Sequence, residues 1–508
     1  MPSSEESPLV SLQLAEHTGR NGLINPFFDI VLKGNVTSRF FNCSARWQQF
    51  SVKDSSPAVV QNILIVAPVV NLQIGYVVPK NSLQPYSGYI FQLSCLNTSA
   101  SVSFKTNGPP IGGVLSVFPL FGGIEILTDF EFTATGWTDD DLPITYMFSY
   151  QSYSAVGSVV RNTIKARSNA TAGVSKLPSV GDANNNFTVI AVAHMYDVYD
   201  SLALYRQSVQ VFPLPVMNTS ETSTLVSTQL QTSLMSGSRD SLKQALALGS
   251  SLLNRVECTQ LPVGYCSTLH RNNCSTVPNT CGVCVAGYDI GESGPHNSIC
   301  ARSDDIVAGT FAPVSAVANG ADLPICDATV ACVNPFQTCN ISSSRCAFVP
   351  LQCRNSCSGH GACNFYNKNS GVQLPGTCVV GDVTCIATCV CVDGYSGKDC
   401  GLSDADLLIR RSTREALLAG LVNLTHSESS SLDTVATWSE NLVGMTQAPV
   451  ELSPSAVTAV VDISSGIIPL LVDLDAASSD ALDTVTGLLQ CMDAAYVADE
   501  SSGGALNI

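Results

Sequence analysis

The chain has 508 residues and a net charge of −17, with only 24 lysines and arginines, which disfavours nucleic acid or an anionic membrane as a partner. Its length predicts several domains. Twenty-one cysteines beside a charged fraction of 13% are typical of a disulfide-rich extracellular protein and unlike a cytosolic enzyme.

Residues 1–107 are predicted to form a β-sandwich, because short apolar alternations recur between turn signals. Trp47 follows Cys43 by four residues and is a candidate core ring of a central strand. Cys43 and Cys95 are the only cysteines of this segment and are predicted to bridge it. Two unpaired buried thiols are the alternative.

Residues 108–216 are predicted to form a second sandwich, which opens at the turn-rich run Gly108-Pro109-Pro110. The sharpest acidic cluster of the chain is Asp139-Asp140-Asp141. One interpretation is a solvated turn between strands. The other is a calcium site between domains, to which Asp197 or Asp200 would contribute further oxygen ligands.

Three segments of these sandwiches are distinctive. They are Tyr89-Ile90-Phe91-Gln92-Leu93, Asn107-Gly108-Pro109-Pro110-Ile111-Gly112-Gly113 and Phe132-Thr133-Ala134-Thr135-Gly136-Trp137-Thr138-Asp139-Asp140-Asp141-Leu142-Pro143-Ile144-Thr145-Tyr146. Through these segments the chain resembles the receptor-for-egg-jelly (REJ) module of the polycystin family over roughly residues 40–255. The resemblance implies sandwiches of the fibronectin or immunoglobulin kind.

Apolar residues at helical spacing predict a helical hairpin over 217–257 and a further helical region over 402–508. In the second region Ser453-Pro454 combines a cap with proline at the first helical position. This region resembles the helical half of the autoproteolysis-inducing (GAIN) domain of polycystins and adhesion receptors, through Trp438, Met445-Thr446 and Pro449-Val450-Glu451-Leu452-Ser453. A plain helical stalk is the alternative.

Eighteen of the 21 cysteines lie between residues 258 and 400. They fall into three predicted modules, 258–301, 322–350 and 353–401, which hold six, four and eight cysteines. Even numbers predict that each module closes its own disulfides. The Cys281-x2-Cys284 pair is expected to be part of disulfides, with half a zinc site or a redox dithiol as alternatives.

The third module resembles an epidermal-growth-factor-like (EGF-like) module in its cysteine spacing and in Gly394-Tyr395-Ser396-Gly397. The resemblance implies the pairs Cys353–Cys363, Cys357–Cys389 and Cys391–Cys400. Cys378 and Cys385 lie in an insertion and are expected to pair with each other. The acidic residues that bind calcium in some such modules are replaced by Val349-Pro350-Leu351-Gln352, so no calcium is expected here.

Sequons agree with an extracellular protein, whereas the expected targeting signals are missing from the sequence. The start Met1-Pro2-Ser3-Ser4-Glu5-Glu6 has no signal-peptide character, and no uninterrupted apolar run of bilayer length is present, so we expect a fragment or ectodomain of a longer protein. Cys491 is left over, and is expected to be a buried free thiol, a bridge to another chain or a bridge to a cysteine beyond Ile508. Nine N-glycosylation sequons occur, at Asn35, Asn42, Asn97, Asn169, Asn186, Asn218, Asn273, Asn340 and Asn423.

Enzyme signatures are missing, and the six histidines are scattered, so no catalytic residue is predicted. We expect a multidomain, mainly β protein: two fibronectin- or immunoglobulin-like sandwiches, a disulfide-rich EGF-like stalk and a helical C-terminal region. The predicted role is the ectodomain of a polycystin-like receptor or channel in adhesion or ligand sensing. The alternative is a subunit of an extracellular filament or coat such as a flagellar hair (mastigoneme). Expected partners are extracellular proteins, glycans or further copies of the chain. No cofactor is expected, unless the acidic cluster at Asp139-Asp140-Asp141 binds calcium.

Overall fold

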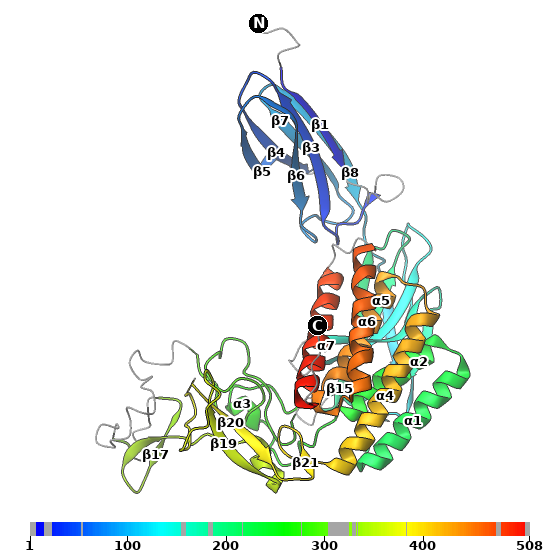
Figure 1. The fold of residues 1–508 in the computed structure, drawn as a ribbon. Coiled ribbons are helices and arrows are strands. Elements are labelled where there is room, and N and C mark those ends of the chain that lie inside the picture. The colour runs from blue at the N-terminus through cyan, green and yellow to red at the C-terminus, as the bar shows by residue number, and fades with distance from the viewer. Residues whose placement is uncertain are drawn as a thin grey trace.

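The structure is a computed structural model that describes residues 7–14, 23–51, 54–153, 159–180, 186–215, 217–275, 277–302, 325–327, 332, 334–382, 384–473 and 479–502. The described chain is mainly β, with helices after the second sheet body and at the C-terminal end, and a disulfide-rich segment between them (Figure 1).

The first sheet body consists of two sheets that enclose one core. A three-stranded sheet has the order β1-β3-β6, and a five-stranded sheet has the order β2-β8-β7-β4-β5. Trp47, Phe91 and Leu93 are fully buried between the sheets, because alternate residues of each strand point inward. The strands are β1 (Leu9–Leu14), β2 (Leu23–Ile24), β3 (Ile30–Ser38), β4 (Cys43–Ser51), β5 (Asp54–Ile65), β6 (Val69–Val78), β7 (Gly88–Cys95) and β8 (Thr98–Thr106).

The second sheet body repeats this topology strand for strand. Its sheets have the orders β14-β11-β9 and β10-β16-β15-β12-β13, so each strand corresponds to the one eight positions earlier. In both bodies the second strand pairs in parallel with the last. The strands are β9 (Val114–Phe118), β10 (Gly123–Ile124), β11 (Asp129–Thr135), β12 (Thr145–Tyr153), β13 (Val159–Ser168), β14 (Ala172–Lys176), β15 (Thr188–Tyr196) and β16 (Leu202–Phe212).

Helices from two distant parts of the chain form one helical body that packs on the second sheet body (Figure 1). Its hydrophobic core combines residues of all six helices with Ile126 and Val160 of the sheet body. Gln244 Nε2 donates to the Ile164 carbonyl at 2.7 Å across this contact. The helices are α1 (Thr219–Ser236), α2 (Arg239–Leu253), α4 (Asp404–Ser427), α5 (Leu432–Thr446), α6 (Pro454–Asp473) and α7 (Ser479–Ser502).

A buried ion cluster ties the two parts of the helical body together. The Glu451 carboxylate lies 2.7 Å from Arg410 Nε and 2.7 Å from Arg414 Nε. Arg414 is fully buried and also donates to the Asn254 side chain at 2.8 Å, which links α4 to the end of α2. A buried charge needs partners of this kind because it has lost its water.

Helix α6 contains a stretch, Pro454–Leu471, that is long and apolar enough to cross a membrane by length and composition. Asp462 and Ser464 interrupt its apolar run, so the sequence shows no uninterrupted apolar stretch of bilayer length there. In the structure Val460 and Ile467 of this helix lie in the core of the helical body. Hydrophobicity alone does not separate a core helix from a membrane span.

The cysteine-rich segment leaves the helical body after α2 and returns to it at α4. Its regular elements are α3 (Tyr265–Thr268), β17 (Gln337–Asn340), β18 (Arg345–Phe348), β19 (Gly361–Asn367), β20 (Cys385–Cys391), β21 (Tyr395–Ser396) and β22 (Leu402–Ser403). With so little regular structure, disulfides and buried polar groups replace a large apolar core. Arg271 is an example: it is 2% exposed, and its guanidinium donates to the carbonyls of Gly282, Gly294 and Glu292.

Candidate cation site between the two sheet bodies

The two sheet bodies meet through a short, closely packed linker. Asn107, at the end of β8, is 2% exposed; its amide N–H donates to the Ile24 carbonyl of the first body, and its side chain donates to Asp197 of the second. Gly108 follows because a Cβ there would lie 1.8 Å from the ring of Tyr86. The Tyr86 hydroxyl in turn donates to the Pro109 carbonyl at 2.8 Å. A larger residue at position 108 would therefore displace the Tyr86 ring and its hydrogen bond to the Pro109 carbonyl.

Three carboxylates converge beside this linker. Asp139 and Asp141 lie in the loop between β11 and β12, and Asp197 lies in the loop between β15 and β16. One oxygen of each lies within 4.8 Å of the others. The two loops are held together by the Val198 amide, which donates to the Asp141 carbonyl at 3.3 Å. The fold therefore joins residues that lie more than fifty positions apart in the sequence.

Hydrogen bonds hold these carboxylates in place. Oδ1 of Asp197 accepts from the amides of Tyr199 and Ser201, both at 2.8 Å, and Asp197 itself is fully buried. Oδ1 of Asp139 accepts from the Asp141 amide at 2.7 Å. The second oxygen, Oδ2 of Asp139, is buried and has no hydrogen-bond partner. A buried acceptor without a partner is costly unless a further group approaches it.

The electrostatics of the cluster favour a cation. Burial raises the pKa of Asp139 above its usual range, and the negative charge of Asp197 raises it further. Burial likewise raises the pKa of Asp197, against the lowering effect of its hydrogen bonds. Both shifts mean that the negative charges are poorly stabilised by their surroundings. Three carboxylates offer between three and six oxygen ligands, whereas Ca²⁺ binds six to eight. Water molecules or carbonyl oxygens would supply the other ligands.

The neighbouring acidic residues named in the sequence analysis lie outside the cluster. Asp140 is exposed and is not among the converging carboxylates. Asp200 pairs instead with Arg167, whose Nη1 lies 2.5 Å from Asp200 Oδ1. Of the two residues expected to contribute from the later loop, Asp197 therefore lies in the site and Asp200 does not.

Comparison with known families bears on the two sheet bodies. Residues 4–248 match the family model of the REJ domain. The chain is therefore similar to the REJ family over this segment. The resemblance read from the three sequence segments is thereby confirmed, and the match also covers α1 and most of α2. A search of the curated proteins finds no match.

The candidate cation site thus lies inside the REJ domain, and six of the nine sequons lie there too. Eight sequon asparagines are exposed in the structure, and Asn35 on β3 is half-buried. Asn218 is also the N-cap of α1, where its Oδ1 accepts from the Glu221 amide at 2.8 Å. A sugar attached to Nδ2 would leave that cap intact.

The structure contains ten disulfides, and every cysteine block closes on itself. Cys281 and Cys284 pair with different partners, so neither is half of a dithiol. The pairs are Cys43–Cys95, Cys258–Cys274, Cys266–Cys281, Cys284–Cys300, Cys326–Cys339, Cys332–Cys346, Cys353–Cys363, Cys357–Cys389, Cys378–Cys385 and Cys391–Cys400.

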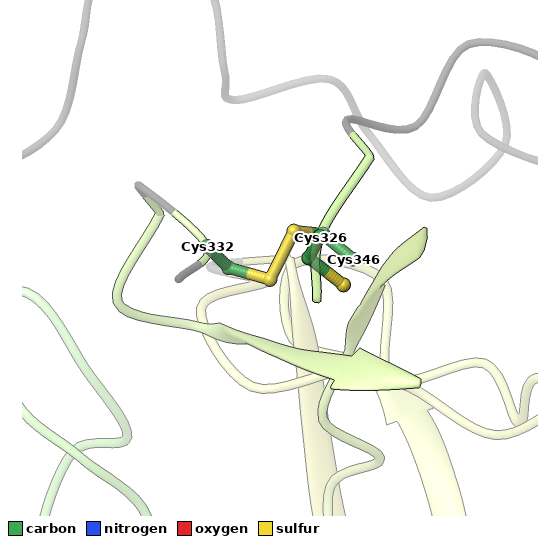
Figure 2. Close-up of side chains that lie close together, drawn as sticks. All are labelled: Cys326, Cys332 and Cys346. Atoms are coloured by element: carbon green, nitrogen blue, oxygen red, sulfur yellow. A yellow bond between two sulfur atoms is a disulfide. The ribbon is translucent and has the colours of Figure 1, made fainter. Parts of the chain in front are cut away.

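Two groups of cysteines lie close enough to resemble metal sites. Figure 2 shows Cys326, Cys332 and Cys346 around one point, and Cys353, Cys357 and Cys389 form a similar group. All six sulfurs belong to disulfides, and zinc binds thiolates rather than disulfide sulfur. These groups therefore arise from adjacent crosslinks.

Peptide mapping of the unreduced full chain provides a test of this arrangement. We expect Cys391 linked to Cys400 and no bond between the second and third modules, because each module holds an even number of cysteines. Mass spectrometry after proteolysis measures both. A stoichiometric zinc content, or a bond from Cys326 to Cys363, would contradict the pairing.

Cys491 is the free cysteine among the described residues. It lies on α7 with its side chain fully buried in the helical body, and Thr446 Oγ1 lies 3.4 Å from its sulfur. Burial raises the pKa of the thiol to about 12. A neutral, enclosed thiol reacts slowly, so the structure favours a packing role over a bridge to another chain.

Proposed function

We propose that this chain is the extracellular part of a polycystin-like receptor or channel and acts in adhesion or ligand sensing. The REJ domain over residues 4–248 is the observation that carries the proposal. Ten disulfides support an oxidising compartment outside the cell.

The finer identity of the modules is part of the same proposal. The identical strand order of the two sheet bodies supports a tandem pair of fibronectin- or immunoglobulin-like sandwiches. The crossed pairs Cys353–Cys363 and Cys357–Cys389, followed by Cys391–Cys400, support an EGF-like module over 353–401. Such modules are used as rigid spacers and binding surfaces outside cells.

Membrane extraction distinguishes the proposed role from a filament subunit. Antibodies against the full chain, used on intact cells of the source, should label the surface. Detergent should then release the antigen as part of an integral membrane polypeptide. Recovery of the antigen in sheared filaments that pellet without detergent would contradict a receptor.

We further propose that Asp139, Asp141 and Asp197 bind Ca²⁺ and that the ion stiffens the junction between the sheet bodies. The site bridges two loops of the second body directly beside Asn107 of the linker. A bound cation would offset the like charges, and it would provide a partner for the buried Oδ2 of Asp139. A rigid junction between tandem modules suits a protein that transmits binding or force.

Calcium should therefore stabilise the full chain against heat. At a free Ca²⁺ concentration of about 100 times the dissociation constant, the free energy of unfolding should rise by about 2.7 kcal/mol. For a domain of the length of the REJ segment this corresponds to an increase in melting temperature of roughly 5–10 °C. Scanning calorimetry with Ca²⁺ and with chelator measures the shift.

Matched variants separate the site from general acidity. The double variant Asp139→Asn/Asp141→Asn should lose the calcium-dependent shift, whereas Asp140→Asn should keep it, because Asp140 is exposed and outside the cluster. An equal shift in the double variant and the parent chain would mean that calcium acts elsewhere.

A further inference from the structure

The end of the first sheet body that lies farthest from the helices is formed by three loops (Figure 1). Leu9, the first residue of β1, pairs with Thr37 next to one of them. They are the β3–β4 loop, the β5–β6 loop and the β7–β8 turn. The Ala67 amide donates to Asn42 Oδ1 at 2.9 Å, which joins the first two loops. The Cys43–Cys95 disulfide joins the first loop to the turn. We call these three loops and the adjoining strand ends the distal tip.

The distal tip exposes an unusual number of large apolar side chains. Phe40 is 67% exposed, Leu64 is 75% exposed and Val70 is 70% exposed. Single exposed apolar residues are common, but several gathered at one place indicate a covered or binding surface. The set at this tip is Leu9, Phe40, Phe41, Leu64, Val66, Val70 and Leu96.

Because the two sheet bodies share one topology, the distal tip of the first body has an equivalent end in the second body, which can be compared with it. In the second body the loops β11–β12 and β15–β16 face the first body, and Asp197 and Tyr199 of the latter loop bond to it. In the first body the equivalent loop β3–β4 and turn β7–β8 carry the sequons of Asn42 and Asn97. A sequon lies in neither of the equivalent loops of the second body. The third loop differs, because Asn169 lies between β13 and β14, the equivalents of β5 and β6. Both ends therefore carry a sequon, and the distal tip is distinguished by carrying two.

We propose that N-linked glycans on Asn42 and Asn97 cover the apolar distal tip, with the Phe40 ring packed against the first sugar on Asn42. The face of an aromatic ring carries negative charge density, and the C–H groups of a pyranose face carry positive density, so the two surfaces attract. Phe40 precedes Asn42 by two residues in the same exposed loop. This inference rests on the extracellular location in the proposed function.

The side chain of Asn42 is already oriented for such an attachment. Its Oδ1 is engaged by the Ala67 amide, so the plane of the amide group is set, and Nδ2 on the exposed side chain is the atom that takes the sugar. The Cys43–Cys95 bond next to it restrains both sequon-bearing segments relative to each other. The glycan bases and the apolar side chains thus belong to one restrained surface.

A double-mutant cycle on the secreted full chain tests the contact between ring and sugar. Ser44→Ala removes the sequon but leaves Asn42 and its bond to Ala67 in place. Phe40→Ala should lower the melting temperature by about 2–4 °C when Asn42 is glycosylated, and by nothing in the Ser44→Ala background. Equal effects in both backgrounds would overturn the proposal.

A matched control uses an exposed aromatic residue on one strand of the second sheet body and a sequon in the loop between two other strands. Phe118 on β9 is 75% exposed, and neither β9 nor its partner β11 holds a sequon asparagine. Phe118→Ala combined with Thr171→Ala, which removes the Asn169 sequon, should give additive melting shifts. If the Phe118–Asn169 pair showed as large a coupling as the Phe40–Asn42 pair, glycans would stabilise the fold without contacting particular rings. That result would overturn the proposed contact between Phe40 and the sugar on Asn42.

Removal of both tip glycans should expose the apolar surface. The variant Ser44→Ala/Ser99→Ala should lose its monomer peak in size-exclusion chromatography and gain fluorescence with an apolar dye, whereas Thr171→Ala should do neither. Unchanged behaviour of the double variant would contradict a covering role.

Site-resolved mass spectrometry and vesicle binding separate the remaining outcomes. Glycans are expected on Asn42 and Asn97 and on exposed control sites such as Asn169. Empty tip sites beside occupied control sites would overturn this inference alone; nine empty sites would overturn the extracellular location itself.

The fully glycosylated chain should not bind phosphatidylcholine–phosphatidylserine vesicles. Binding would assign the tip, with its Arg39, to a lipid surface instead.

Discussion

Replacement of Glu451 by alanine is expected to lower the free energy of unfolding of the helical body by about 3–5 kcal/mol. The variant leaves the guanidinium of Arg414, which is fully buried, without its carboxylate partner. Burial already lowers the pKa of Arg414, and the neighbouring Glu451 acts in the opposite direction. Chemical denaturation followed by far-ultraviolet circular dichroism measures the loss, because the helices dominate that signal.

Two further variants distinguish an unpaired buried charge from a general loss of contacts. Glu440→Ala breaks the Arg161–Glu440 pair, whose side chains are 20% and 19% exposed, and should cost about 1 kcal/mol or less. Arg414→Met/Glu451→Leu removes the fully buried arginine together with its carboxylate and leaves only Arg410, which is 18% exposed, without this partner. The double variant should therefore recover much of the stability lost in Glu451→Ala. A double variant less stable than Glu451→Ala would contradict this explanation. It would mean that the loss of the arginine–carboxylate attraction, and not the burial of an unpaired arginine, causes most of the destabilisation.

Removal of the Cys43–Cys95 disulfide should have a comparable effect on the first sheet body. The bond closes a loop with a sequence separation of 52, and chain entropy gives about 4 kcal/mol for a loop of this length. The expected result for Cys43→Ala/Cys95→Ala is therefore a lower unfolding temperature of the first sheet body, with the helical body unchanged.

Differential scanning calorimetry of the full chain measures this shift, and a shorter disulfide provides the control. Cys378–Cys385 has a sequence separation of 7, for which the same relation gives only about 2.5 kcal/mol. Unchanged unfolding after removal of the longer bridge would show that the sheets alone hold the first body together.

Much of the chain could be predicted from local patterns. Alternating apolar residues predicted the strands around Trp47 and Phe91, and Ser453-Pro454 predicted the start of α6 at Pro454. The REJ family was identified from three short segments and confirmed by the match over residues 4–248. Cysteine counts predicted an extensively disulfide-bonded segment, which the structure contains. These features depend on residues close together in the sequence.

The arrangement of the helices was decided by tertiary packing. Asn254 and Arg414 bond to each other across 160 positions of sequence, with the whole cysteine-rich segment between them. Amphipathic spacing shows that each helix has an apolar face but not which surface covers that face. For the same reason hydropathy could not place α6 in the core of the helical body.

The sequence alone determined the REJ family, the order of strands and helices, and the disulfide-rich character of the middle segment. Only the tertiary structure decided that Asp197 and not Asp200 joins Asp139 and Asp141, and that the apolar residues around Asn42 lie together at one exposed tip. The physical reason is that periodicity and turn chemistry act over a few residues. Carboxylate convergence, burial and exposure depend instead on how loops from distant strands meet when the sheets close around their core.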